Sequence, residues 1–207
     1  MKTSKMSQVL ARFDLEQNNI PLLESPNLFR FGSKNEYEID VADNLNSRIE
    51  AYQLVYRLYK EMGYAGDEPT GMWYSIYNAQ ANATTLIIKN IVTKKIIATL
   101  TIVFDGILGL PFEEYYPKEM AMLRSKNRKC AEIISLGFDE SVRGSSEMLI
   151  QLFKYAHVIY NSIYEASDIL IKIKPNHSFF YQRKLLFEAL GDEVKCTKMN
   201  NGRAQLY

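Results

Sequence analysis

The stretch from Thr84 to Phe104 constrains the fold most, because it holds two segments of strand composition separated by a very short link. β-Branched residues are concentrated at 84–89 and 95–104, and only residues 90–94 lie between them. Two such segments joined by so few residues form an antiparallel hairpin. A third segment, 131–138, is apolar on both faces, which is typical of a strand in the middle of a sheet. The chain is therefore predicted to contain one central sheet.

Helices are predicted where apolar residues recur at steps of three and four. The clearest helix precedes the hairpin and has its apolar face at Leu45, Ile49, Tyr52, Tyr56 and Tyr59. The spacing from Ser47 to Glu50 is that of a capping box, and Gly63 supplies a stop. Further helices are predicted over 112–123, from Ser145 or Ser146 to about Tyr164, and over 179–190; further strands are predicted at 37–41, 169–173 and, bent near residues 200–202, at 194–206.

This order of elements predicts an α/β (α+β) fold in which one mixed, mostly antiparallel sheet is flanked by helices. The single domain is expected to cover residues 37–207. Residues 1–36 contain Pro21 and Pro26 and show weak periodicity. They are expected to form an N-terminal extension that packs across the domain, with one short helix at 9–15.

Composition excludes several classes of protein. The formal net charge is only +1, so no nucleic-acid partner is expected. Cys130 and Cys196 make neither a disulfide framework nor a zinc motif, and no metal site is predicted. No segment is apolar for long enough to be a signal peptide or to span a membrane. A cytoplasmic location is the resulting expectation.

Three blocks of sequence resemble the N-acyl amino acid synthase family, whose members are GNAT-like acyltransferases related to the acyl-homoserine-lactone synthases. The first block is YQLVYRLYKEMGY at 52–64, and the third is His177 with FYQRKLLFEALG at 180–191. The middle block is the most specific: ATLTIVFD at 98–105, GLP at 109–111, then Glu119, Leu123, Arg124 and AEIISL at 131–136. Together the blocks cover roughly residues 45–195.

The resemblance implies a GNAT-like fold and direct attack of an amine on a thioester, without an acyl-enzyme. In that fold the sheet opens, and the pantetheine arm of the donor enters the gap. We expect this gap between the strands at 95–104 and 131–138. A backbone N–H in the gap would then point at the thioester oxygen, where such a donor stabilises the developing oxyanion.

Three residues are candidates for proton transfer. Glu132 starts an apolar strand, and partial desolvation raises the pKa of a carboxylate toward the working range of a general base. It also stands where acyl-homoserine-lactone synthases carry a glutamate, although an ion pair with Arg128 or Lys129 is the alternative. His177 follows a strand end and can relay a proton near neutral pH, or it can cap a helix. Tyr181 either protonates the leaving thiolate or packs in the core.

Four residues are candidates for substrate binding. Arg57 would pair with a carboxylate on the amine substrate, or it is a surface charge. Asp105 either holds the substrate ammonium or turns the chain. Leu136 belongs to the middle block of the resemblance. Trp73 departs from the family, because an arginine is expected near this position.

The donor is expected to be an acyl-phosphopantetheine thioester, on a carrier protein or on coenzyme A, with no bound cofactor. Enzymes that use coenzyme A cradle its pyrophosphate in a glycine-rich loop at a helix N-terminus. The matching segment here, Ser141–Glu147, contains Arg143 and one glycine, Gly144. An acidic carrier protein instead needs a basic docking surface. That surface is predicted at Arg124, Lys126, Arg128 and Lys129.

These residues predict N-acyl transfer from an acyl carrier protein to the amine of an amino acid or similar small molecule. Because the fatty tail of such an amide is lipid-like, a peripheral contact of the protein with a membrane through its product is compatible with this prediction. Three alternatives stay open: an acyl-homoserine-lactone-type signal synthase, a coenzyme A-dependent N-acetyltransferase and a GNAT-shaped binding module without catalysis.

Overall fold

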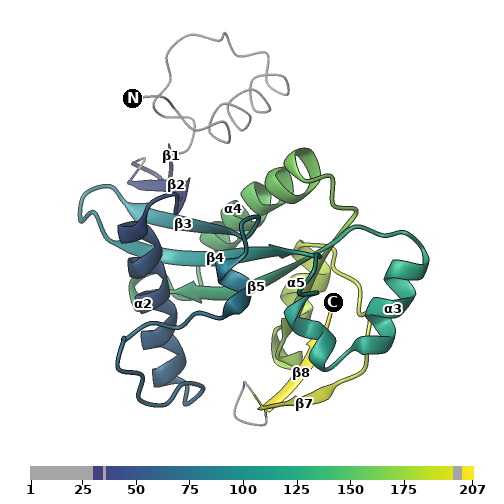
Figure 1. The fold of residues 1–207 in the computed structure, drawn as a ribbon. Helices are drawn as coiled ribbons and strands as arrows, with labels where there is room; N and C mark the ends of the chain where they lie inside the picture. Colours follow the sequence, from purple (N-terminus) through teal and green to yellow (C-terminus); the bar gives the residue numbers. More distant parts are fainter. Residues whose placement is uncertain (1–29, 35, 198–201) are drawn as a thin grey trace, which may run out of the picture.

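The computed structural model describes residues 30–34, 36–197 and 202–207, and these form one eight-stranded sheet with helices on both faces (Figure 1). The strand order is β1-β2-β3-β4-β5-β6-β8-β7. The strands are β1 (Arg30–Phe31), β2 (Tyr37–Val41), β3 (Thr84–Asn90), β4 (Ile96–Phe104), β5 (Cys130–Phe138), β6 (Asp168–Ile173), β7 (Val194–Cys196) and β8 (Gly202–Leu206). Only β5 and β6 pair in parallel, so the predicted mixed, mostly antiparallel sheet is confirmed.

Side chains alternate between the two faces of the sheet along each strand, so their contacts show which helix covers which face. Leu86 and Ile88 of β3 pack in the same cluster as α4 (Ser146–His157), whereas Ile87 packs against α2 (Leu45–Glu61). Figure 1 shows α2 in front of the sheet and α4 behind it. On the α2 face, Val103 and Leu170 contact a second cluster that includes the 3-10 helix η2 (Pro111–Glu114) and α3 (Pro117–Ser125). No helix among the described residues is both long and apolar enough to cross a membrane.

The start of α2 differs from the predicted capping box. Asn44 is the N-cap, and its side chain accepts a hydrogen bond from the Ser47 N–H at 3.0 Å. Glu50 does not return to the helix start; instead its carboxylate accepts the N–H of Ile96 on β4 at 2.8 Å. An asparagine cap satisfies a free N–H of the first turn as well as a serine cap would, which releases Glu50 to hold the helix against the sheet.

Two other helices are shorter than predicted. The segment 112–123 divides into η2 and α3, because Pro117 begins a new helix at its first position. The last helix, α5 (Ser178–Lys184), ends well before Leu190. Leu186 takes a left-handed backbone (φ 58°), and the N–H groups of Leu185 and Phe187 both reach the Tyr181 carbonyl, which closes the helix.

Some of the remaining predictions of helices and strands concern residues that the structure describes, and others concern residues outside them. Ser145 caps α4 as expected, and a π-helical segment, Val158–Ile163, continues it. The predicted tail forms β7 and β8, although the bend at 200–201 lies outside the described residues, as does the short helix expected at 9–15. Within the segment expected to be an extension, β1 already pairs with β2. The division at residue 36 stays a prediction.

The sheet opens between β5 and β6, not between β4 and β5 as expected. β4 and β5 stay paired from Phe104↔Ala131 to Ala98↔Phe138. The parallel register of β5 with β6 ends at Ile133↔Ile171, after which β6 pairs only with β8. A β-bulge on β5 follows directly, since its register with β4 shifts between Thr99 and Thr101. A bulge increases local twist and bends its strand, so β5 turns away from β6 at this point.

Candidate active site

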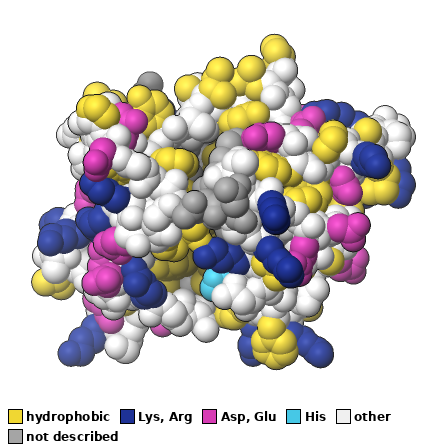
Figure 2. All heavy atoms as spheres, turned by 90° about the horizontal axis from the view of Figure 1, so that it is seen from below, with side chains coloured by type: hydrophobic (Ala, Val, Ile, Leu, Met, Phe, Trp, Pro, Cys, Tyr) yellow, Lys and Arg dark blue, Asp and Glu magenta, His cyan; other side chains and the backbone are white. Residues whose placement is uncertain are grey.

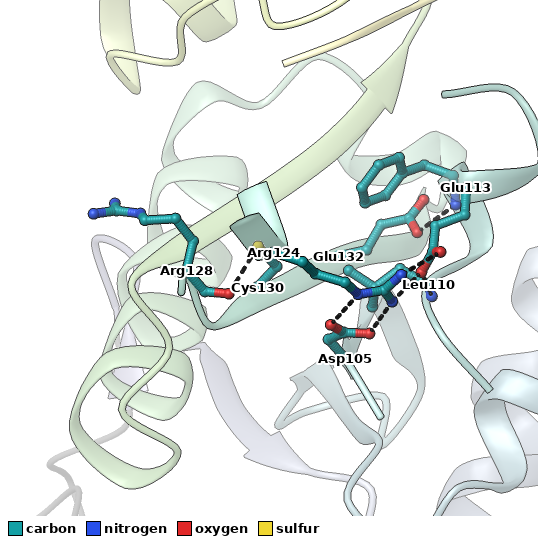
Figure 3. Close-up of polar contacts among 8 residues, drawn as sticks. Asp105, Leu110, Glu113, Arg124, Arg128, Cys130 and Glu132 are labelled. Carbon is teal, nitrogen blue, oxygen red and sulfur yellow. Dashed lines mark hydrogen bonds and ion pairs between the residues drawn. The ribbon is translucent and has the colours of Figure 1, made fainter. Parts of the chain in front are cut away.

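Glu132 lies on β5 just before the gap and is 2% exposed. Its side chain lies on the α2 face of the sheet, where its Oε2 accepts the backbone N–H of Phe112 in η2 at 2.8 Å (Figure 3). The expected alternative partners are occupied elsewhere: Arg128 pairs with Asp168 at 2.5 Å and Lys129 with Glu165 at 3.2 Å. The carboxylate is therefore held within the protein by η2.

The bulge next to Glu132 changes which residues face α2. Ser135 has a left-handed backbone (φ 54°), and neither Ser135 nor Leu136 is opposed by a residue in the registers with β4 and β6. Leu136 packs toward the α4 cluster, whereas Gly137 lies against Leu58 of α2. A left-handed non-glycine residue costs about 1–3 kcal/mol and persists only where its surroundings impose it. The strained position coincides with the point where the sheet opens.

Tyr181 lies on the opposite face of the sheet from Glu132. It is buried in α5, and its ring makes edge contacts with Phe153 of α4 at 5.8 Å and with Phe187 at 6.0 Å. Burial raises the pKa of Tyr181. Its phenol consequently stays protonated at neutral pH, which is the state required to donate a proton.

Four other residues predicted in the site, two for the donor, one for proton transfer and one for the amine substrate, lie at the open end of the β5–β6 pair. His177 is exposed at the start of α5, and its backbone N–H donates to the Lys174 carbonyl at 3.0 Å. Gly144 (φ 82°) precedes the N-cap of α4 and has open space where a Cβ would be. Arg143 pairs with Glu61 at 3.4 Å. Arg57 pairs with Asp139 at 2.7 Å, so its guanidinium is bound to the protein's own carboxylate.

The predicted docking surface at 124–129 is largely neutralised by ion pairs. Arg124 lies between Asp105 and Glu113, at 2.6 and 2.7 Å, beside a surface cavity of about 420 Å³ (Figure 3). Arg128 and Lys129 are paired as described above, which leaves Lys126. This segment also precedes β5, whereas the gap opens toward the other end of that strand. Its docking role stays a prediction, and Asp105 binds Arg124 in this structure.

Trp73 belongs to a row of aromatic rings on the α2 face. Its ring lies 5.3 Å from Tyr59, which lies 5.8 Å from Tyr64, and Trp73 lines a surface cavity of about 360 Å³. Burial raises the pKa of Tyr59 to about 12. The row ends at Lys174, the residue directly after β6 (Asp168–Ile173), whose Nζ lies 4.8 Å from the centre of the Tyr64 ring.

Two lysines, Lys172 on β6 and Lys174 just after that strand ends, were not predicted as site residues. Lys172 and Lys174 are half-buried, and Lys172 Nζ lies 4.2 Å from the centre of the Tyr115 ring. Figure 2, seen from below relative to Figure 1, shows several separate lysine and arginine side chains across that face of the molecule. The available signal was alternation: residues 170 and 172 share one face of β6, so an apolar position is followed by a cation there, and Lys174 follows two residues later, just after the strand ends. No group of three histidine, cysteine, aspartate or glutamate side chains within the described ranges can hold a metal ion.

Comparison with known proteins places this site in context. A family model described as N-acyl amino acid synthase FeeM matches residues 50–207. The structure of FeeM, an N-acyl amino acid synthase from uncultured soil microbes, is 26% identical over 82% of this chain and 89% of that chain, with a TM-score of 0.69. No curated protein matches the chain.

More distant structures share the fold. The AHL synthase LasI is 14% identical over 82% of this chain and 86% of that chain, with a TM-score of 0.58. An acetyltransferase from Trypanosoma brucei is 14% identical over 77% and 98% of the two chains, with a TM-score of 0.52. The predicted GNAT-like fold is thereby confirmed.

Proposed function

Because the chain belongs to the N-acyl amino acid synthase FeeM family and is an acyltransferase, we propose that it transfers a fatty acyl group from an acyl carrier protein to the amine of an amino acid or similar small molecule. The observation that carries the proposal is Glu132, a buried carboxylate beside the point where β5 leaves β6. A buried carboxylate held at a gap in a sheet is suited to accept a proton from an amine.

The proposed reaction uses both faces of the sheet. The amine nitrogen attacks the thioester carbonyl, a C–N bond forms, the C–S bond breaks, and the amine proton passes to Glu132. The departing thiolate takes its proton from Tyr181, on the α4 and α5 face. The unopposed backbone of Ser135 and Leu136 supplies N–H donors for the carbonyl oxygen. Such a donor contributes about 2.7–4 kcal/mol of transition-state stabilisation in other enzymes.

The loop before α4 supports a carrier protein as the donor. Gly144 is the one glycine between Ser141 and Glu147, and the Ser145 side chain already accepts the Met148 N–H at 3.3 Å. Coenzyme A would present a pyrophosphate and needs several free N–H groups here. A pantetheine arm tethered to a carrier protein presents one phosphate, which needs fewer.

Docking of the carrier protein is proposed at basic side chains near the open end of the gap. Arg183 and Lys184 of α5 form no ion pair with any described residue, unlike Arg124, Arg128 and Lys129. Free cations attract an acidic partner more strongly than neutralised ones. Charge reversal at Arg183 and Lys184 should raise KM for the carrier protein and leave a free pantetheine thioester unaffected. A larger rise in KM for the carrier protein on charge reversal at Arg124 and Arg128 would instead indicate that the carrier protein docks at residues 124–129.

Mass spectrometry of the products tests the function. The purified protein is incubated with C8–C18 acyl groups on carrier protein, beside the same groups on coenzyme A, and a pool of amino acids. A fatty amide formed only from the carrier protein supports the proposal. An amide formed equally well from coenzyme A contradicts the proposal that the donor is a carrier protein. A lactone product indicates a signal synthase. The absence of product from either donor contradicts the proposed acyl transfer.

A cytoplasmic site of action is proposed on two grounds. Cys130 and Cys196 are both free thiols, which is usual in a reducing compartment. The proposed donor is also an intracellular carrier. Fractionation of cells that express the full chain tests this location.

A further inference from the structure

We propose that Lys172 binds a carboxylate of the acceptor, with Lys174 as a second cation, so that the enzyme selects α-amino acids over simple amines. The inference rests on the proposed function, because it concerns the acceptor side of the same site. It assigns to β6 the role that Arg57 was expected to have. Arg57 is paired with Asp139, whereas neither lysine has an ion-pair partner among the described residues.

The sheet register puts Lys172 beside Glu132. Glu132 of β5 is opposite Leu170 of β6, and both side chains lie on the α2 face with η2. Lys172 is the next residue of β6 on that face, because side chains alternate along a strand. Two residues of rise and one strand spacing separate the Cα atoms of Glu132 and Lys172 by about 8 Å. Lys172 is also the first residue of β6 beyond the register with β5, so it borders the gap.

The surroundings of Lys172 leave its charge available. Burial removes part of the hydration of a lysine ammonium, and a carboxylate partner offsets that cost. Here the ammonium groups of both lysines lie against tyrosine rings, at 4.2 Å for Tyr115 and 4.8 Å for Tyr64. A ring face stabilises the cation without neutralising it. An incoming carboxylate can therefore pair with an ammonium that keeps its full charge.

Tyr115 holds Lys172 in a defined position. The Tyr115 hydroxyl and Thr197 Oγ1 are 2.7 Å apart, and Tyr115 follows directly after η2, which holds Glu132 through the Phe112 N–H. The same short segment thus orients the proposed base and the proposed carboxylate receptor. In an α-amino acid the amine and the carboxyl carbon are both bonded to one carbon atom. A molecule of this size fits between two side chains that approach from neighbouring strands.

A binding experiment tests the inference without requiring turnover. The probes are N-dodecanoylglycine, which has the carboxylate, and its carboxamide, which does not. The fluorescence of Trp73, the single tryptophan, reports binding because its ring contacts Tyr59, which contacts Tyr64 beside Lys174. The wild type should bind the acid about 10- to 100-fold more tightly than the amide, the usual effect of a charged hydrogen bond.

The variants then identify the residue. Lys172→Met should remove the preference by weakening only the acid, and Lys172→Arg should keep most of it. Lys89→Met is the matched control, because Lys89 is also half-buried but lies on β3 opposite Glu38. Equal affinity of the wild type for both probes, no binding of either, or a preference that survives in Lys172→Met would each overturn the assignment.

Kinetics separate this inference from the proposed function. With glycine and glycinamide as acceptors, Lys172→Met should raise KM for glycine and leave kcat/KM for glycinamide unchanged. An equal loss with both acceptors would show that Lys172 serves the chemistry or the fold, and would refute carboxylate recognition. If the wild type binds the acid selectively but forms no amide, the proposed function fails while the carboxylate site stands.

Discussion

Replacement of Glu132 by glutamine separates the proposed chemical role of this residue from its structural one. The glutamine carbonyl can still accept the Phe112 N–H that Glu132 accepts at 2.8 Å. A hydrogen bond to a charged acceptor contributes about 1.5–3 kcal/mol to stability, and one to a neutral acceptor about 0.5–1.5 kcal/mol, so the exchange costs about 1 kcal/mol. For a protein of 207 residues this corresponds to about 2–4 °C in Tm. Glu132→Gln should therefore fold.

The loss of activity should be much larger than the loss of stability. Glutamine cannot take the amine proton, and a positioned general base contributes about 10²–10⁴ in rate. That factor corresponds to about 2.7–5.4 kcal/mol of activation free energy. The assay follows thiol release from the acyl donor with a thiol reagent, alongside calorimetric melting of the same preparations.

Glu132→Ala is the comparison variant. It leaves the buried Phe112 N–H without its acceptor, which costs about 1–3 kcal/mol, and adds a cavity cost. Alanine should thus lower both Tm and turnover strongly, whereas glutamine should lower turnover strongly and Tm by only about 2–4 °C. Turnover of Glu132→Gln within threefold of the wild type would remove this residue from the mechanism. A fall in its Tm as large as that of Glu132→Ala would assign it a structural role.

Three further predictions concern stability and reactivity. Gly137→Ala should destabilise the fold by about 1–3 kcal/mol, because the new Cβ would lie 2.8 Å from Leu58 Cδ1; Leu58→Ala should relieve part of this cost in urea melts, and strictly additive effects would contradict the clash. Burial opposes the charged form of Asp168, but hydrogen bonds from Arg128 and Ser167 outweigh it and lower the pKa of this carboxyl. Because exposed ion pairs contribute little, Arg128→Ala should lower Tm only slightly near pH 7 and not at all once the pH falls below that pKa; a loss of Tm that persists in acid would refute the pairing. Burial raises the pKa of Cys130 to about 11, so native protein should resist alkylation by iodoacetamide near pH 8 until it unfolds, and rapid native labelling would disprove the burial.

The strands and longer helices could be predicted because their signals are local. Thr84–Asn90 and Ile96–Phe104 alternate or run apolar over consecutive residues, and the face of α2 repeats within single turns. Helix ends were less predictable. Asn44 competes with Ser47 for the cap, and the left-handed Leu186 ends α5 although no glycine or proline marks that position.

The candidate site was predictable in its residues but not in its connections. Glu132 could be identified from its place at the start of an apolar strand and from the family resemblance. Its partner, the Phe112 N–H, lies twenty positions away along the chain. Arg124 could be counted as a positive charge, but its neutralisation by Asp105 and Glu113 depends on how three segments meet.

The sequence by itself thus determined the order of strands and helices, the central position of β5 and the identity of Glu132 as a candidate base, since each depends on neighbours along the chain. Only the tertiary structure decided that the sheet opens between β5 and β6, that Arg124, Arg128 and Lys129 are paired, and that Lys172 has no ion-pair partner among the described residues. The physical reason is that strand separation and charge neutralisation depend on distances between segments remote in sequence. Hydrophobic periodicity carries no information about those distances.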